Sequence, residues 1–296
     1  MKYLKLIAQI TLLILAGLSS VYASSVFVDG ETLQKKLANK DLVIIDMSNE
    51  RQYKRFHLPN ALYISFGEMN ERKKNGVSDS IGVERMIKLL SDKGLTANDD
   101  IVIYDDMAAL HAARLYWELE RLGHKKVAIL DGGLVGWVLN NNKVSNAPVT
   151  RPKSIYKATK VSSNTLASLS DVIAASKGSK TLVIDVRSEG EYTGNPKKPR
   201  TGHIPGALWY PWNQSVNLDK GFNQKSPAEI TKNLNSLGVT DKNAELIVLC
   251  QSGHRASQAY ITLKDLGFNN VRLYDGSMSE YSKDKTAPLI KGNNAR

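Results

Sequence analysis

The chain has 296 residues, a length that predicts about two domains of ~150 residues each. Its 42% apolar content excludes disorder as the state of the whole chain. The formal net charge is +11, from 40 basic and 29 acidic residues, but the basic residues form no arginine-rich arm and no stripe interleaved with aromatic side chains. These features argue against nucleic acid as a partner and favour attraction of small anions. A single cysteine excludes an internal disulfide and any multi-thiolate metal cluster.

The first 23 residues have the pattern of a secretory signal peptide. Lys2 and Lys5 form a positive n-region, residues 6–18 form an apolar h-region, and Val21-Tyr22-Ala23 has small or compact residues where cleavage requires them. We therefore expect cleavage after Ala23 and export, to the periplasm if the source is bacterial, with no stable membrane anchor on the mature chain. An uncleaved anchor is the alternative, although the apolar run is shorter than the ~20 residues of a spanning helix.

After this segment, short apolar runs of strand length alternate with amphipathic runs of helical periodicity. The clearest predicted strands are Leu42–Asp46, Ile101–Tyr104, Leu182–Asp185 and Leu246–Leu249. The clearest predicted helical runs are Ile87–Leu90, Ala112–Leu122, Ile230–Leu237 and Ala256–Leu266. Continuously apolar strands between helices predict parallel sheets covered on both faces. The expected fold class is therefore α/β, with the site at the carboxyl ends of the strands.

The order of these elements occurs twice along the chain. His57-Leu58-Pro59-Asn60-Ala61 is matched by His203-Ile204-Pro205-Gly206-Ala207, and Asp131-Gly132 is matched by Asp275-Gly276; the offsets between the copies are 139 to 146 positions. This is a domain-sized duplication and not a short solenoid repeat. We expect tandem domains over 24–145 and 164–296. A linker over 146–163 joins them, within an aperiodic stretch rich in Asn, Ser, Lys and Pro.

The only cysteine, Cys250, ends the strand Leu246–Leu249, and a loop leads from it to a helix expected to open at Arg255. A strand–loop–helix turn directs backbone N–H groups and the positive end of a helix dipole into the loop. A thiol placed there is expected to lose its proton readily and to act as a nucleophile in an anion-binding cradle. The alternative is a buried inert cysteine. A place at a strand end, in a chain expected to be exported, favours the reactive thiol.

Comparison of the two copies separates scaffold from chemistry. The His-x-Pro-x-Ala turn is present in both, so we interpret His57 and His203 as turn-stabilising residues. Three positions differ between the second copy and the first: Cys250 falls opposite Asp105, Arg255 opposite Leu110, and Arg187 opposite Ser48. Because the first copy lacks the nucleophile and both arginines, we expect it to be catalytically inactive and to serve as a wall or lid for the second.

Together these features resemble the tandem-domain rhodanese sulfurtransferases over nearly all of the mature chain. The matching pieces are Asp185-Val186-Arg187, Glu191-Tyr192, Gly202–Ala207, the loop Cys250–Arg255 and Asp275-Gly276. The resemblance implies that the second domain is catalytic and the first is not. It also implies ping-pong transfer of sulfane sulfur, in which Cys250 takes sulfur from a donor such as thiosulfate, forms a persulfide, and passes the sulfur to cyanide or a thiol.

The predicted substrate-binding residues surround this nucleophile: Arg187, Trp212, Gln251, Ser252, Gly253, His254 and Arg255. The N–H groups of residues 251–255 are expected to converge on Sγ, and Gly253 lets the backbone approach without a Cβ. Arg255 and Arg187 each present a planar donor fork to an oxyanion. Gln251 and Ser252 are expected to shape the rim of the site.

Three features keep two interpretations each. His254 either adds charge or shuttles a proton at the mouth of the site, or it is a solvent-facing loop residue. Trp212 either lines the pocket, as the resemblance implies, or packs in the core. The basic segment Asn195–Arg200 either brings charge to the mouth or is a solvated loop. No cofactor is expected, and five histidines without ligand spacing predict no metal site.

Other functions share parts of this pattern. Cysteine phosphatases and arsenate reductases use a Cys-x5-Arg loop, one residue longer than the spacing from Cys250 to Arg255, and the tighter loop favours sulfur over a phosphoryl group. A 3-mercaptopyruvate sulfurtransferase is the second alternative, but a polar loop that ends in arginine favours thiosulfate. The third is an exported carrier that holds sulfur on Cys250 for one protein acceptor, without turnover.

Overall fold

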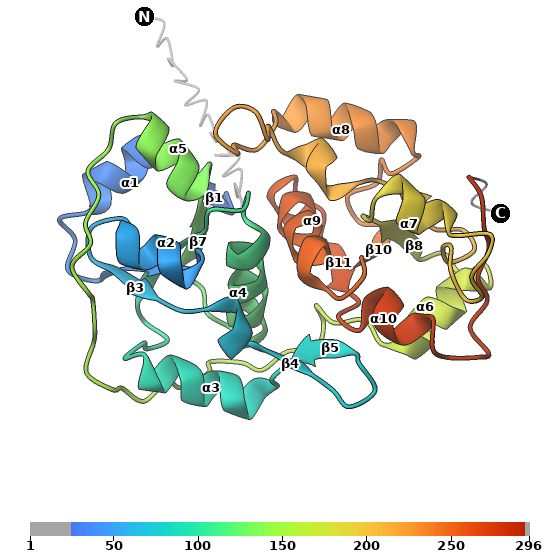
Figure 1. Ribbon diagram of the computed structural model, residues 1–296, viewed down its shortest axis with the longest axis horizontal. Coiled ribbons are helices and arrows are strands. Elements are labelled where there is room, and N and C mark those ends of the chain that lie inside the picture. Colours follow the sequence, from blue (N-terminus) through green and yellow to red (C-terminus); the bar gives the residue numbers. More distant parts are fainter. Residues whose placement is uncertain (1–24, 294–296) are drawn as a thin grey trace, which may run out of the picture.

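The computed structural model describes residues 25–293, which form two α/β domains side by side (Figure 1). In each domain a parallel sheet is flanked by helices, which confirms the predicted fold class. The expected signal peptide and its cleavage after Ala23 lie outside the described residues. Within residues 25–293, no helix combines the length and the apolar character needed to cross a membrane.

The first domain contains a five-stranded parallel sheet in the order β1-β7-β6-β2-β3. Its strands are β1 (Phe27–Val28), β2 (Leu42–Asp46), β3 (Ala61–Tyr63), β6 (Asp100–Tyr104) and β7 (Val127–Leu130). Its helices are α1 (Gly30–Lys36), α2 (Glu50–Arg55), α3 (Val83–Asp92), α4 (Leu110–Arg121) and α5 (Gly133–Leu139). A short helix η1 (Phe66–Glu68) leads into an antiparallel hairpin of β4 (Asn70–Arg72) and β5 (Ser78–Ser80), which reaches toward the second domain (Figure 1).

The second domain contains a four-stranded parallel sheet in the order β11-β10-β8-β9. Its strands are β8 (Leu182–Asp185), β9 (Leu208–Trp209), β10 (Glu245–Leu249) and β11 (Asn270–Leu273). Its helices are α6 (Leu169–Ser176), α7 (Glu189–Thr193), η2 (Trp212–Ser215), α8 (Pro227–Ser236), α9 (His254–Asp265) and α10 (Ser277–Tyr281). The segment 140–168 between α5 and α6 contains the predicted linker and forms no helix and no strand beyond isolated bridges.

The central strand β10 explains the position of the cysteine. Residues 246–249 are fully buried because helices cover both faces of the sheet, and this burial accounts for their continuously apolar sequence. In the parallel register, Leu249 lies beside Asp185 of β8. The N–H of Val186 then donates to the carbonyl of Leu249 at 3.0 Å. The two strands therefore end together, and they bring Cys250 next to the turn that carries Arg187.

The two domains meet where α4 of the first packs against α9 of the second (Figure 1). Leu115 and Leu119 of α4 and Tyr260 and Leu263 of α9 belong to one apolar core cluster, so burial of apolar surface holds the domains together. The rings of His111, near the start of α4, and His254, at the start of α9, also stack across this interface. The first turns of α4 and α9 are consequently adjacent, and each follows a loop at the carboxyl end of its own sheet.

Helix α9 begins at His254, so the expected start at Arg255 is wrong by one residue. Gly253 precedes the helix with a φ of 78°, a left-handed conformation in which residues with a Cβ are uncommon. A Cβ at this position would lie 2.3 Å from Oδ1 of Asp275. Glycine therefore lets the chain turn into the helix one residue earlier and lets the loop lie directly on the Asp275 turn.

Candidate functional site

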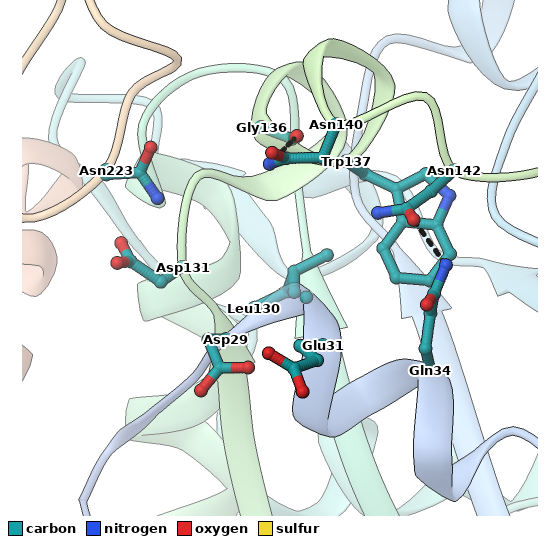
Figure 2. Close-up of a pocket in the computed structure, with 11 residues that line it drawn as sticks. Asp29, Glu31, Gln34, Leu130, Asp131, Gly136, Trp137, Asn140, Asn142 and Asn223 are labelled. Atoms are coloured by element: carbon teal, nitrogen blue, oxygen red, sulfur yellow. Dashed lines mark hydrogen bonds between the residues drawn. The ribbon is translucent and has the colours of Figure 1, made fainter.

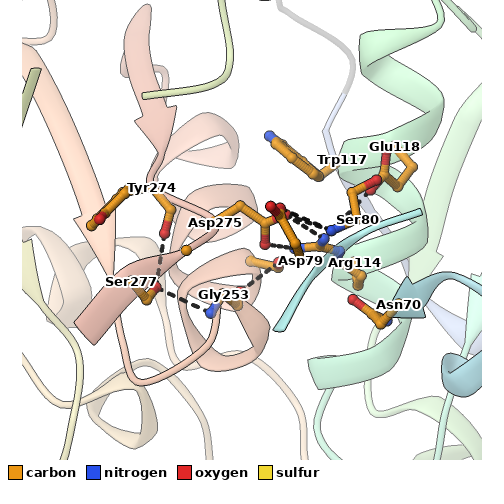
Figure 3. Close-up of polar contacts among 12 residues, drawn as sticks. Asn70, Asp79, Ser80, Arg114, Trp117, Glu118, Gly253, Tyr274, Asp275 and Ser277 are labelled. Carbon is orange, nitrogen blue, oxygen red and sulfur yellow. Dashed lines mark hydrogen bonds and ion pairs between the residues drawn. The ribbon is translucent and has the colours of Figure 1, made fainter. Parts of the chain in front are cut away.

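Cys250 directly follows β10 and is 1% exposed. Its backbone N–H donates to Oγ of Ser277 at 3.2 Å, and its carbonyl accepts a hydrogen bond from the N–H of Met278 at 3.1 Å. The N–H of Gly253 donates to the same hydroxyl at 3.1 Å (Figure 3). The turn that begins α10 therefore holds the Cys250 loop at both of its ends.

The loop leads into a helix start whose N–H groups are available to an anion. Within residues 25–293, the backbone N–H groups of Arg255 and Ala256 have no hydrogen-bond acceptor. The first N–H groups of any helix lack intrahelical partners, and the helix dipole adds to their attraction for negative charge. The side chain of Cys250 lies at the start of this loop, where such an attraction acts on a thiolate.

The equivalent loop of the first domain already binds a negative charge, which its own Asp105 supplies. Asp105 follows β6 as Cys250 follows β10, and its carboxylate accepts four backbone hydrogen bonds. The donors to Oδ1 are Met107 and Ala109, each at 2.9 Å, and the donors to Oδ2 are His111 at 2.7 Å and Ala112 at 2.9 Å. The loop geometry of this fold is therefore suited to an anion.

The two loops differ in length by one residue. Asp105 lies five positions before the first residue of α4, whereas Cys250 lies four before the first residue of α9. When the helices are aligned, the counterpart of Arg255 is His111, so the expected pairing with Leu110 is wrong. The constant offset behind that pairing fails because the first loop has an extra residue. The two unsatisfied N–H groups of α9 then correspond to those that bind Oδ2 of Asp105.

Arg255 forms a bidentate ion pair with Glu191 of α7, at 2.7 Å and 2.8 Å. The hydrogen bond from Arg255 is the largest influence on Glu191 and, with hydrogen bonds from Ser188, lowers the pKa of Glu191 to about 2. The hydrogen bond to Glu191 raises the pKa of Arg255, and the charge of Cys250 raises it further. Arg255 therefore brings positive charge to the thiol, while Glu191 occupies its donor fork. Direct contact of Arg255 with a substrate stays a prediction.

Arg187 lies just beyond β8 and is 4% exposed. Its Nε and Nη2 donate to the carboxylate of Asp185, with a shortest distance of 2.6 Å, and Nη2 also donates to the carbonyl of Gly202 at 2.8 Å. In the described part of the chain, Nη1 is the guanidinium nitrogen without an acceptor. Two of the three guanidinium nitrogens of Arg187 are therefore bound within the domain, and Nη1 is the one left to bind a substrate anion.

A pocket of about 340 Å³ lies beside the Cys250 loop. Arg187, Gln251 and residues of the segment 194–202, including Lys198 and Arg200, line it. The guanidinium of Arg200 is bound to main-chain carbonyls between residues 281 and 287, so Arg187 and Lys198 give the pocket its available positive charge. The predicted basic segment therefore borders a pocket next to the nucleophile, and its lysines are exposed.

A second pocket of about 330 Å³ lies between the first domain and Asn223 of the second domain, and its lining is acidic (Figure 2). The carboxylates of Asp29, Glu31 and Asp131 and the amides of Asn140 and Asn142 line it. Negative side chains repel an anionic donor, and the only cysteine lies beside the other pocket. The pocket beside the Cys250 loop is therefore the better candidate for an anionic substrate.

His254 lies in the domain interface and not in solvent. Its ring packs against both Phe66 and His111 of the first domain, at centroid distances of 4.5 Å and 4.9 Å, and those two rings contact each other at 4.8 Å. Burial, followed by the charges of His111 and Arg114, lowers the pKa of His254 to about 3. The ring is neutral at physiological pH. The expectations of a positive charge at the mouth and of a solvent-facing residue are therefore both wrong, because the other domain covers this side of α9.

The remaining residues singled out in the sequence lie either at the rim of the site or in the supporting structure. Gln251 is exposed and Ser252 is half-buried, in agreement with positions at a rim. Trp212 packs, partly buried, against the apolar core, which favours its interpretation as a core aromatic. His57 and His203 are 0% exposed, and their Nδ1 atoms bond to main-chain carbonyls at 2.7 Å and 2.9 Å, as expected of turn-stabilising residues.

Ser277 is a site residue to which the sequence pattern assigned no role. The Asp-Gly turn occurs in both copies, but the residue after it is glycine in the first copy and serine in the second. That difference was the available signal. Within the described range, no group of three or more His, Cys, Asp or Glu side chains could hold a metal ion.

Three comparisons with known proteins agree with this architecture. The rhodanese-like domain model matches residues 29–140 and again residues 168–284. A thiosulfate sulfurtransferase of Corynebacterium glutamicum is 33% identical over 285 residues, which cover 91% of each chain. The crystal structure of SseA from Escherichia coli, from the 3-mercaptopyruvate sulfotransferases, has a TM-score of 0.77 and 26% identity, over 86% of this chain and 99% of that chain.

A more distant structure, EanB, shares the fold with a TM-score of 0.76 at 20% identity, over 86% of this chain and 64% of its own. The domain match occurs in both halves of the chain, and the relative from Corynebacterium matches along nearly the whole length. On these grounds the chain belongs to the rhodanese family, as a sulfurtransferase with two tandem domains.

Proposed function

We propose that the protein transfers sulfane sulfur from thiosulfate to a thiophilic acceptor, cyanide or a thiol, through a persulfide on Cys250. One observation carries the proposal: the N–H groups of Arg255 and Ala256 lack acceptors within residues 25–293, and their counterparts in the first domain bind the carboxylate of Asp105. These donors stabilise the negative charge of a thiolate or persulfide on Cys250, as their counterparts stabilise the Asp105 carboxylate in the first domain.

In the first half-reaction, the thiolate of Cys250 attacks the outer sulfur of thiosulfate. A bond forms between Sγ and that sulfur, the sulfur–sulfur bond of thiosulfate breaks, and sulfite leaves with its electron pair. The N–H groups at the start of α9 and the guanidinium of Arg255 stabilise the negative charge of the persulfide. Lys198 and Nη1 of Arg187 attract the oxygens of the dianion from the adjacent pocket.

In the second half-reaction, the acceptor attacks the outer sulfur of the persulfide. The new bond to the acceptor forms as the bond to Sγ breaks, and Cys250 leaves as a thiolate. Cyanide yields thiocyanate, and a thiolate yields a new persulfide. Atoms and electrons balance without an external oxidant or reductant, so the cycle needs only a donor and an acceptor.

A second donor, 3-mercaptopyruvate, is supported by the similarity to the Escherichia coli structure. The short polar loop from Cys250 to Arg255 and the basic pocket support thiosulfate instead. The ratio of the two kcat/KM values with a common acceptor decides between the donors. We expect the higher value for thiosulfate, and a higher value for 3-mercaptopyruvate would reverse the assignment.

Export is part of the proposal. The Lys2 and Lys5 n-region, the apolar run over 6–18 and the Val21-Tyr22-Ala23 site support it. Expression of the full chain in a bacterial host, followed by fractionation and intact-mass measurement, tests it. We expect a periplasmic protein that begins at Ser24. A cytoplasmic protein that keeps residues 1–23 would contradict export.

Mass spectrometry after treatment with thiosulfate tests the chemistry. The peptide that contains Cys250 is expected to gain one sulfur atom, which subsequent cyanide removes. Cys250→Ser is expected to abolish the gain and the turnover without loss of the folded state, so retained activity in this variant would refute the assignment. A sulfur atom gained once, with no multiple turnover, would identify a carrier and not an enzyme.

A further inference from the structure

Arg114, on α4 of the first domain, forms a buried ion pair with Asp275 of the second domain (Figure 3). Its Nη1 lies 2.5 Å from Oδ1 and its Nη2 lies 2.8 Å from Oδ2, so the pair is bidentate. Arg114 is 1% exposed and Asp275 is 3% exposed. The domain without a nucleophile thus supplies a charged side chain to the domain that has one.

Asp275 belongs to the turn that holds the Cys250 loop. Two residues after it, the hydroxyl of Ser277 accepts a hydrogen bond from the N–H of Cys250. The same hydroxyl accepts from the N–H of Gly253 and donates to the carbonyl of Tyr274 at 2.7 Å (Figure 3). A Cβ at Gly253 would lie 2.3 Å from Oδ1 of Asp275 and 3.0 Å from Nη1 of Arg114. The loop therefore packs directly on the interdomain ion pair.

Other charged groups also face the Asp275 turn: Glu118 of α4, Asp79 of β5 and Glu280 of α10. The backbone N–H of Ser80 donates to Oδ2 of Asp275 at 2.9 Å. Burial, then the hydrogen bond to Asp275 and its charge, raises the pKa of Asp79 to about 6. Burial would also raise the pKa of Asp275, but the charge and hydrogen bonds of Arg114 outweigh it and hold that pKa below its usual value.

We propose that Arg114 is a positioning residue for sulfur transfer, because it fixes the Asp275 turn and, through Ser277, the orientation of the Cys250 loop. The proposal rests on Cys250 as the reacting group of the proposed function. It assigns the inactive domain a defined part in the reaction, beyond that of a wall beside the site. The path runs from the guanidinium to Asp275, from this turn to the Ser277 hydroxyl, and from the hydroxyl to the N–H groups of the loop.

Loss of Arg114 leaves Asp275 as a buried carboxylate beside Asp79 with no cation at its oxygens. The turn is then expected to shift or to take up a proton. Either change moves the Ser277 hydroxyl away from the loop. The N–H groups at the start of α9 then point less directly at Sγ, and the thiolate loses stabilisation. Charged groups that face the loop itself, Arg255 and Glu191, are unchanged.

Arg114→Met in the full-length mature chain tests the proposal, with Arg85→Met as the matched control. Arg85 is an exposed arginine of α3 that pairs with Glu71, so the control removes the same charge and the same volume away from the loop. Because Cys250 is the only cysteine, the rate of alkylation by iodoacetamide against pH reports the thiol alone. We expect the alkylation rate at neutral pH to fall about tenfold in Arg114→Met and kcat/KM for thiosulfate to fall about 100-fold. The control is expected to match the wild type.

Two further variants separate positioning from simple stabilisation. Arg114→Lys keeps the positive charge but loses the bidentate guanidinium pair with Asp275. If Arg114→Met does not fold, Arg114→Lys provides the test of the proposal. We expect Arg114→Lys to show slower alkylation at neutral pH and a reduced kcat/KM. Arg114→Met combined with Asp275→Asn removes both charges, and we expect it to recover the melting temperature but not the alkylation rate.

The proposal is overturned if Arg114→Lys has the wild-type alkylation profile and the wild-type kcat/KM. It is also overturned if the double variant recovers both stability and reactivity, since Arg114 would then only neutralise Asp275. The alkylation measurement does not need a sulfur donor. Failure of thiosulfate transfer in the wild type would therefore refute the proposed function without affecting the test of Arg114.

Discussion

Ser277 of the second domain occupies the position of Gly133 in the first, and both have a left-handed backbone, with φ values of 47° and 51°. The residue after each donates its N–H to the equivalent carbonyl: Leu134 to Asp105 at 2.9 Å and Met278 to Cys250 at 3.1 Å. A left-handed conformation costs a residue with a Cβ on the order of 1 kcal/mol. The second domain tolerates that cost at Ser277, whose hydroxyl accepts two N–H groups of the Cys250 loop.

We predict that Ser277→Gly lowers kcat/KM for thiosulfate about tenfold and also lowers the melting temperature. Glycine relieves the backbone strain, but this relief offsets only part of the three lost hydrogen bonds, each worth about 1 kcal/mol. Steady-state kinetics and a thermal melt provide the two readouts. Ser279→Ala is the control, because Oγ of Ser279 donates only to the carbonyl of Gly276 in the described structure. Wild-type kinetics in Ser277→Gly would show that the hydroxyl does not orient the loop.

Arg187→Lys is predicted to raise the KM for thiosulfate more than it lowers kcat. The lysine keeps a positive charge near Asp185 but loses Nη1, the part of the fork available to a donor anion. When a binding interaction that stabilises the bound substrate and the transition state equally is lost, KM rises and kcat changes little. Arg187→Ala is a less informative change, because Asp185 is 0% exposed and would be left as an unpaired buried carboxylate, at a cost of about 3–5 kcal/mol.

The KM for cyanide provides the internal control for Arg187→Lys. The acceptor reacts with the persulfide after sulfite has left, so its KM is expected to be unchanged. An unchanged KM for thiosulfate would argue against a role of Arg187 in donor binding. A fall in kcat alone would instead place its effect on the Cys250 loop.

The ion pair between Glu191 and Arg255 predicts a pH-dependent stability. Folding lowers the pKa of Glu191 from its ordinary value of 4.5 to about 2, chiefly through the hydrogen bond from Arg255. A carboxylate with a lowered folded-state pKa stabilises the fold above pH 4.5, and that contribution disappears as the pH falls toward 2. Glu191→Gln lacks this contribution at every pH.

Chemical denaturation of the wild type and of Glu191→Gln between pH 7 and pH 2 measures the effect. The difference in unfolding free energy is expected to be constant above about pH 5 and to vanish near pH 2. The control is Glu50→Gln, since Glu50 forms an exposed pair with Lys54 on the surface of α2. A difference that is independent of pH would contradict the lowered pKa.

Much of the fold follows from local sequence, whereas the details of the site depend on contacts between distant residues. The apolar runs that become β8 and β10 and the cysteine at the end of β10 are local features, so they could be predicted. The start of α9 could not, because it depends on the contact of Gly253 with Asp275. The pairing of Arg255 with Leu110 failed through a single extra residue in the first loop.

Pairings across the domains leave still less trace in the sequence. Arg114 and Asp275 are 161 positions apart, and nothing in their local patterns marks them as partners. The position of His254 was inferred incorrectly for the same reason, since Phe66 and His111 come from the other domain. The duplication nevertheless contained one usable signal, the glycine-to-serine difference between positions 133 and 277.

The buried His254 leads to a last prediction, which concerns acid stability. Its pKa falls from 6.5 to about 3 on folding because of burial and the charges of His111 and Arg114. Below pH 6.5 the unfolded chain therefore binds a proton that the folded chain does not, and stability declines as the pH falls toward 3. His254→Phe keeps an aromatic ring against Phe66 and His111 but cannot take up a proton.

We predict that His254→Phe loses less stability than the wild type between pH 6.5 and pH 4 and keeps the wild-type pH profile of thiosulfate transfer near neutrality. Denaturant titrations at several pH values and kcat/KM against pH measure the two effects. His124→Phe controls for the loss of a titrating histidine elsewhere, because burial also lowers the pKa of His124 away from the Cys250 loop. If His254→Phe abolished transfer at neutral pH while His124→Phe did not, the imidazole would act on the substrate, and its assignment as a packing residue of the interface would be wrong.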